Sequence, residues 1–221
     1  MIRPAVLSAT LIAVLIQSAG STPPPHFEKG FTPLFDGKTL KGWEGNPRMF
    51  RVEKQAIVAG TLKAKVPHND FLCSTRRFGD FELRLQARLI GQGNNAGVQF
   101  RSSRIPNHFE VKGYQCDIGT MQNRPIWGSL YDESRRRKFL AEGPKQKLIA
   151  VLRRPGKKQE GWNDLVIRCE GPRVRIWVNG FQTVDYVEKA KEIPRTGIIG
   201  LQIHGGAPAE AWYRRIRIRQ L

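Results

Sequence analysis

The sequence predicts an all-β protein whose strands form a two-sheet antiparallel sandwich. Short runs of alternating hydrophobic and polar residues recur along the chain, as expected for strands with one buried and one solvated face. The 22 Gly and 14 Pro residues indicate many turns between these runs. No stretch has the pattern of a long amphipathic helix, and no repeat recurs at a fixed period, which disfavours a propeller or a solenoid.

The strands can be placed one after another by their period-two alternation. In residues 81–89, Phe, Leu, Leu, Ala and Leu occupy one face, and Glu, Arg, Gln and Arg occupy the other. Asn179-Gly180 is a strong hairpin signal, because both residues accept the positive φ angles of a tight turn. We therefore expect 173–178 and 181–187 to pair. The remaining strands are expected at 98–101, 165–170, 196–204 and 211–221.

Residues 119–147 show no clean alternation and include the basic run Arg135-Arg136-Arg137-Lys138. We expect a long loop here, with at most a short helix. Long ordered loops on sandwiches often carry functional residues.

The composition indicates one folded domain with a strong positive charge. A chain of 221 residues with 40% hydrophobic and 25% charged residues is not mostly disordered. Lys and Arg total 37 against 19 Asp and Glu, so the net charge of +18 predicts attraction to polyanions. The basic runs match no specific nucleic-acid-binding motif. We expect their side chains to lie on solvated outer faces of strands. The alternative is a lectin-like module for acidic polysaccharide, or nonspecific binding to phosphates.

Residues 1–20 have the pattern of a secretory signal peptide. Arg3 supplies a cation, residues 5–16 are an apolar run, and Ser18-Ala19-Gly20 are small residues suited to cleavage. The apolar run is shorter than the about 20 residues that a stable membrane span needs. We expect export to the periplasm or the extracellular space, a Pro-rich leader at 21–30 and a single domain at 31–221. An uncleaved membrane anchor is the alternative.

The chain has three cysteines, Cys73, Cys116 and Cys169, each in a separate expected strand. An odd number this small excludes a dense disulfide framework. We interpret them as buried strand residues, although one disulfide pair is an alternative. No His lies at ligand spacing from them, which argues against a zinc site.

Several motifs together resemble the 3-keto-disaccharide hydrolase domain family, also described as 3-keto-glucoside 1,2-lyase and 3-keto-2-hydroxyglucal hydratase. The resemblance spans about Phe31 to Leu221. It is carried by the ordered set Phe31–Trp43, Phe78–Leu83, Asn95–Arg101, Gly113–Gln115, Gly128–Tyr131, Trp162–Asn163, Val178–Gly180 and Gly197–His204, and by the closing strand of alternating Arg and Ile.

This resemblance implies a jelly roll of the concanavalin A-like lectin/glucanase type, with a carbohydrate site on the concave face of one sheet. It also implies cleavage of glycosides that carry a ketone at C3. The sequence departs from the family pattern at Gln115 and Asp117, where the family often has Glu and Gln, and at Ala96, where it often has Ser.

A C3 ketone acidifies the hydrogen at C2, so removal of this proton can expel the anomeric oxygen, and water can then add back. The reaction needs a base, an acid for the leaving oxygen, and donors or a metal for the enolate oxygen. Side chains two residues apart in a strand point to the same face. Three pairs of polar residues therefore share a face: Gln99 with Arg101, Gln115 with Asp117, and Gln202 with His204. Our hypothesis makes Asp117 the base, Arg101 the enolate clamp and His204 the leaving-group acid.

Further substrate-binding candidates are Gln99, Gln115, Gln202, Glu110, Trp127 and Tyr131. Each assignment has a structural alternative. Asp117 could end a strand as a turn former, Arg101 could pair with Glu110, and His204 could be a loop residue without a chemical duty. Trp127 could stack on a sugar or pin a loop to the sandwich. A divalent metal bound by Asp117, Glu110 and His204 is left open.

Two function hypotheses follow from the sequence. The first is an exported enzyme that cleaves 3-keto-glycosides. The second is a non-catalytic carbohydrate-binding sandwich. They differ in whether an acid, a base and an enolate stabiliser converge on one face.

Overall fold

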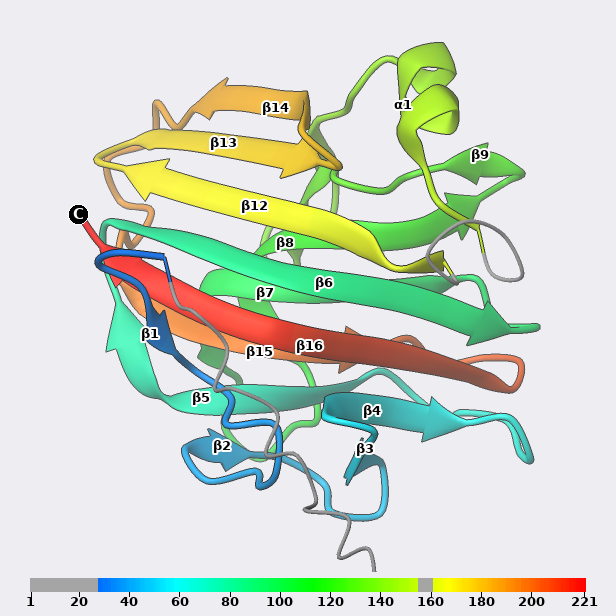
Figure 1. Ribbon diagram of the computed structural model, residues 1–221. Coiled ribbons are helices and arrows are strands. Elements are labelled where there is room, and N and C mark those ends of the chain that lie inside the picture. Colours follow the sequence, from blue (N-terminus) through cyan, green and yellow to red (C-terminus); the bar gives the residue numbers. More distant parts are fainter. Residues whose placement is uncertain (1–27, 155–160) are drawn as a thin grey trace, which may run out of the picture.

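The computed structural model describes residues 28–154 and 161–221, which form two stacked antiparallel sheets (Figure 1). The expected signal peptide lies outside these residues. The first sheet has the order β14-β13-β12-β6-β16-β4-β3, with β1 paired to β16. Its strands are β1 (Thr32–Pro33), β3 (Phe50–Glu53), β4 (Ala56–Thr61), β6 (Phe81–Gly91), β12 (Asn163–Glu170), β13 (Arg173–Val178), β14 (Phe181–Val187) and β16 (Ala209–Gln220).

The second sheet has the order β11-β10-β8-β7-β15-β5-β2, with β9 paired to β8. Its strands are β2 (Trp43–Glu44), β5 (Asp70–Phe78), β7 (Asn95–Arg104), β8 (Val111–Met121), β9 (Arg124–Pro125), β10 (Leu130–Glu133), β11 (Phe139–Ala141) and β15 (Gly197–Ile203). The architecture confirms the predicted all-β jelly-roll sandwich.

A short helix, α1 (Lys145–Val151), packs near the β9 and β14 end of the molecule. In the described part of the chain, no helix combines the length and apolar character needed to cross a bilayer.

The core lies between the two sheets and is built from the alternating residues that the sequence indicated. On β6, Phe81, Leu83 and Leu85 are buried, and on the opposing sheet Cys116 and Ile118 of β8 are fully buried. The three cysteines are buried in β5, β8 and β12 and unpaired, which confirms their interpretation as buried strand residues.

The expectation of a long loop at 119–147 was wrong, because this segment contains the end of β8, the strands β9, β10 and β11, and the start of α1. The inward-facing positions of β10 are Leu130 and Asp132, both fully buried. Asp132 is paired with Arg135 and Arg136. A buried carboxylate at an inward position removes the apolar alternation by which strands are recognised.

The hairpin formed by β7 and β8 bends back over the outer face of the second sheet. A β-bulge falls between Phe100 and Ser103, and Arg101 within it has a φ of 46°. Beyond the bend, Val111 packs on the outward side chains of Phe71 and Cys73 in β5. Bulges bend strands in this way, and here the bend places the hairpin tip beside the face that carries the polar side chains.

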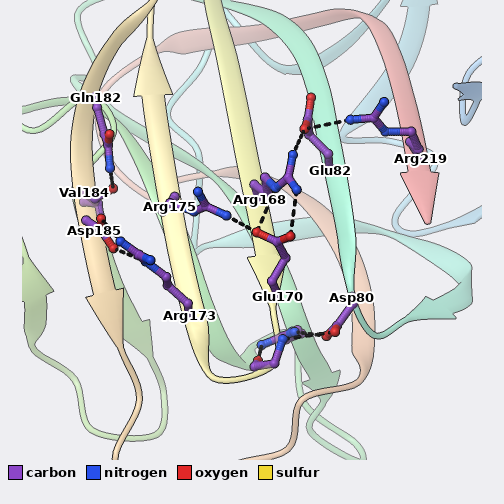
Figure 2. A network of polar contacts seen from close by, with 12 residues as sticks. Asp80, Glu82, Arg168, Glu170, Arg173, Arg175, Gln182, Val184, Asp185 and Arg219 are labelled. Atoms are coloured by element: carbon purple, nitrogen blue, oxygen red, sulfur yellow. Dashed lines mark hydrogen bonds and ion pairs between the residues drawn. The ribbon is translucent and has the colours of Figure 1, made fainter. Parts of the chain in front are cut away.

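The outer face of the first sheet carries arginine and carboxylate side chains in mutual contact (Figure 2). Glu82 lies between Arg168 and Arg219, at 3.0 and 3.2 Å, and Glu170 lies between Arg168 and Arg175. The alternating arginines of the last strand therefore lie on a solvated outer face, as expected.

We predict that Gly197→Ala destabilises the protein by about 1–3 kcal/mol, because the bend brings backbone directly against this glycine. An added Cβ would lie 2.4 Å from the backbone carbon of Arg101 and 2.4 Å from the nitrogen of Ser102. Urea unfolding measures the loss. Gly79→Ala is the matched control, since its Cβ would meet only the Thr196 hydroxyl at 3.3 Å. Equal stability of the two variants would contradict the close approach.

Candidate functional site

A cavity of about 500 Å³ lies on the outer face of the second sheet, under the tip of the β7–β8 hairpin. Its walls come from segments far apart in the sequence. The lining residues are Asn69, Asn95, the hairpin residues His108 to Glu110, Gln115, Asp117 and Met121 of β8, Tyr131, Glu133 and Ser134 in and after β10, Arg137, Phe139 of β11, and His204 after β15. Its volume is within the range of small-molecule sites.

Strand alternation places the polar side chains on this face. On β8, Tyr114, Cys116 and Ile118 point into the core, so Gln115 and Asp117 point the other way. Two strands, β8 and β7, separate Glu133 of β10 from Gln202 of β15 in the sheet. Gln202 Nε2 is nevertheless 3.5 Å from Glu133 Oε2. Three strand spacings amount to roughly 14 Å in a flat sheet, so these side chains can meet only because the face is concave.

A chain of hydrogen bonds runs under the cavity floor to Asp117. The Ser102 hydroxyl lies 2.8 Å from Gln99 Oε1 and shares its one proton with the carbonyl oxygens of Phe100 and Tyr114, at 2.9 and 3.3 Å. Gln99 Nε2 donates to Gln115 Oε1 at 2.7 Å. Gln115 Nε2 then donates to Asp117 Oδ1 at 2.6 Å. Gly97 is the partner of Asp117 in the β7–β8 ladder. Its lack of a side chain makes room for the side chain of Gln115, because a Cβ at Gly97 would lie 2.4 Å from Gln115 Cδ.

Two carboxyl groups of the cavity have raised pKa values. Burial raises the pKa of Asp117 to about 8, opposed by the Gln115 hydrogen bond and reinforced by the nearby charge of Glu133. Burial also raises the pKa of Glu133 to about 7, with a further contribution from Glu110. Near neutral pH, the pair therefore holds a proton and can also accept one.

Three other polar residues complete the wall. Glu110 accepts hydrogen bonds from Asn69 Nδ2 at 2.9 Å and from the Ser134 hydroxyl at 3.3 Å. Arg137 is exposed and carries the permanent positive charge among the described lining residues. The Nδ1 atom of His204 lies 2.6 Å from the Gly205 carbonyl oxygen, which can only accept, so Nδ1 is the donor of this hydrogen bond.

Aromatic rings line the hairpin side of the cavity. Phe109 is 44% exposed, and its ring stacks against His68 at 4.1 Å and lies 4.3 Å from the ring of His108. Tyr131 and Phe139 meet edge to face at 5.1 Å. An exposed aromatic ring held between other rings inside a polar cavity is suited to contact the C–H face of a sugar.

The structure brings five of the sequence candidates together: Asp117, His204, Gln115, Glu110 and Tyr131 all line the cavity. Asp117 lies within β8 and does not end it, so the turn interpretation was wrong.

Arg101 does not line the cavity, so the expectation that it acts as the enolate clamp was wrong. Its guanidinium donates to Gly79 O, Gly171 O and Asp80 Oδ1, at 3.0, 2.7 and 2.7 Å. The pairing with Glu110 was also wrong. Both errors have one cause, because the bulge at Arg101 interrupts the period-two count that placed it beside Gln99.

The remaining candidates lie outside the cavity wall. Gln99 and Gln202 are fully buried, and both connect to residues of the wall through hydrogen bonds. Trp127 belongs to the hydrophobic core, so it pins its segment to the sandwich and does not face a ligand.

Sequence reasoning missed Glu133, Arg137 and Phe109. Glu133 and Arg137 fell in the segment interpreted as a loop, and the spacing of Tyr131 and Glu133 was the available signal of a strand with an outward polar face. Phe109 sits at a hairpin tip, where the sequence gives no indication of which residues the tip approaches.

The described residues contain no group of three or more His, Cys, Asp or Glu side chains arranged to hold a metal ion. The set Asp117, Glu110 and His204 lines one cavity without forming such a group.

Comparisons with known proteins agree with this geometry. The profile of the 3-keto-alpha-glucoside-1,2-lyase-like domain matches residues 30–219. A curated 3-keto-disaccharide hydrolase of Bacteroides thetaiotaomicron is 22% identical, with 87% of this chain and 79% of that protein covered.

Two solved structures show a similar fold. A protein of Parabacteroides distasonis described as a candidate glycosyl hydrolase is 20% identical with a TM-score of 0.63, covering 86% of this chain and 99% of its own. The carbohydrate-binding module CBM66 of Bacillus subtilis is 15% identical with a TM-score of 0.59, covering 81% and 96%.

We predict that Asp117→Asn gains stability relative to the wild type as pH rises from about 4 to about 8. The unfolded carboxyl ionises near its ordinary pKa of 3.8, whereas the folded one holds its proton to about 8. The wild type therefore loses about 1.4 kcal/mol per pH unit in this window, and Asn does not titrate. Urea unfolding at pH 5 and pH 8 measures the difference. The exposed Glu44→Gln is the control, and a constant difference between Asp117→Asn and the wild type would contradict the burial argument.

Proposed function

The chain belongs to the 3-keto-alpha-glucoside-1,2-lyase-like domain family, and we propose that it cleaves the glycosidic bond of 3-keto-glycosides by elimination and hydration. The observation that carries this proposal is the presence of two carboxyl groups with near-neutral pKa values in one concave cavity.

In the elimination step, the Glu133 carboxylate removes the proton at C2, which the C3 ketone acidifies. The electron pair forms an enolate and then the C1–C2 double bond, the C1–O bond breaks, and protonated Asp117 gives its proton to the leaving oxygen. Asp117 is thus assigned as acid, in place of the base expected from the sequence, because burial keeps it protonated to a higher pH than Glu133.

In the hydration step, water adds across the double bond. The hydroxide part joins C1 while the Asp117 carboxylate takes the remaining proton of the water, and Glu133 returns its proton to C2, so both carboxyl groups regain their starting states. His204 in its neutral form offers its Nε2 atom as acceptor for this water, since Nδ1 is committed to the Gly205 carbonyl. This differs from the acid role expected for His204.

The enolate oxygen needs a positive partner, and Arg137 is assigned to it in place of Arg101. Arg137 lines the cavity, and its charge already lowers the pKa of Glu133. Phe109 and Tyr131 would contact the apolar face of the sugar, while Gln115 and Glu110 contribute polar groups to the wall.

Export of the protein is part of this proposal and is supported by the apolar N-terminal run at 5–16. Expression of the full chain with fractionation of the cells tests it: the protein is expected, shortened near residue 20, outside the cytoplasm. Full-length protein retained in the cytoplasm would contradict export.

A second candidate function is a carbohydrate-binding module without catalysis. It is favoured by Gln115, which stands where the family often has Glu, and by the similarity in fold to a carbohydrate-binding module. Under this alternative, the protein would bind sugars without converting them.

We predict that purified protein converts 3-keto-glycosides and not their unoxidised parents, and that Asp117→Asn and Glu133→Gln each lower kcat at least 100-fold. General acid or base catalysis is typically worth this much. Chromatography of the products measures turnover, with Glu44→Gln as the control. Binding of the 3-keto-glycoside by the wild type without turnover would favour the binding module and contradict the enzyme.

The pH dependence of kcat/KM, which reports the groups of the free enzyme, is predicted to be bell-shaped with a maximum between about pH 7 and 8. Activity rises as Glu133 loses its proton near pH 7 and falls as Asp117 loses its proton near pH 8. Both limbs are apparent values of a coupled pair. Initial rates from pH 5 to 10 measure the profile, and activity that is undiminished at pH 10 would contradict the acid role of Asp117.

A further inference from the structure

We propose that Ser102, Gln99 and Gln115 form a positioning relay, in which a one-way chain of hydrogen bonds fixes the Asp117 carboxyl so that its proton faces the cavity. This inference deepens the proposed function and rests on the acid role of Asp117. None of the three residues is proposed to transfer a proton itself.

The direction of the relay follows from the donors and acceptors. Gln99 turns its oxygen toward the Ser102 hydroxyl and its amide nitrogen toward Gln115. Gln115 therefore receives at its oxygen and donates from its nitrogen to Asp117 Oδ1. The carbonyl oxygen of a neutral carboxylic acid is a better acceptor than its hydroxyl oxygen, so this bond to Oδ1 favours the acidic proton on Oδ2.

The packing leaves the relay little freedom to rearrange. Gln99, Gln115 and Ser102 are at most 2% exposed. Gln99 and Gln115 are direct partners in the β7–β8 ladder, so their side chains start side by side on the same face. Buried polar groups that are paired with one another favour a single arrangement.

Gly97 and Gly113 make the relay sterically feasible. A Cβ at Gly97 would lie 2.4 to 2.7 Å from atoms of the Gln115 side chain. A Cβ at Gly113 would lie 2.3 Å from the Ser102 hydroxyl oxygen, and Gly113 also has a φ of 146°. Both ends of the relay therefore pass through space that only glycine leaves open.

The relay explains a buried glutamine, Gln99, that the reaction itself does not use. Gln99 does not line the cavity, and it contacts neither Asp117 nor the space for a ligand. Its two amide atoms are satisfied by Ser102 and Gln115. A change at Gln99 should thus affect the acid without affecting substrate contacts.

The test is a ¹³C NMR titration of the Asp117 carboxyl in the intact protein, compared for Gln115→Met, Gln99→Met and Gln86→Met. Removing the donor to Oδ1 removes a bond that favours the ionised form, so the midpoint should rise by about one pH unit in Gln115→Met. A smaller rise is expected in Gln99→Met, which leaves Gln115 free to turn. Gln86→Met is the control, because Gln86 bonds Asp164 and Arg214 on the other sheet.

Kinetics on a 3-keto-glycoside form the second arm. Gln99→Met should lower kcat about tenfold with KM unchanged and move the alkaline limb upward, while Gln86→Met leaves both parameters unchanged. A purely structural role would lower the melting temperature of Gln99→Met without moving either titration.

The two proposals fail separately. An unshifted Asp117 midpoint in both relay variants would overturn the relay, whatever the activity. A shifted midpoint in a protein that converts no 3-keto-glycoside would sustain the relay and overturn the proposed function.

Discussion

The burial of the Asp117 carboxyl is the constraint on which the rest of the cavity depends. A carboxyl that is 3% exposed must remain neutral or find donors for its charge, and the protein supplies one amide donor at 2.6 Å. The result is a group whose pKa is raised by burial but which remains able to ionise. The bent hairpin, the small residue Gly97 and the paired glutamines all serve to hold this group in its place.

The two faces of the sandwich have different electrostatic roles. On the outer face of the first sheet, arginines are paired with carboxylates such as Glu82 and Glu170, and these pairs lie near solvent (Figure 2). The pairs of the partly exposed Glu170 contribute little to stability, whereas Glu82 is buried and its charge needs its arginine partners. On the other sheet, carboxyl groups gather in a cavity of a chain whose net charge is +18.

Most of the fold could be predicted from alternation, because strands such as β6 and β12 bury one clean apolar face. Residues of the candidate site could be predicted only where that alternation continues without interruption. This is the case on β8, where the alternation places Gln115 and Asp117 on the outer face. Arg101 was misplaced because a single extra residue in a bulge changes which side the following residues face. Glu133 was missed because Asp132 beside it is buried with arginine partners, so the strand lacks an apolar pattern. Phe109 reaches the cavity through a tertiary bend that no local pattern encodes.

The central claim is that this cavity moves a proton at C2 of a 3-keto-glycoside, and turnover in D₂O tests it most directly. The carboxyl proton that Glu133 gains in the elimination exchanges with D₂O before the addition, so the return step places one deuterium on C2 of the released keto sugar, which mass spectrometry detects against an enzyme-free control for spontaneous exchange. The account predicts one deuterium per turnover at that carbon. A cleaved product without deuterium at C2 would show direct hydrolysis and contradict the account.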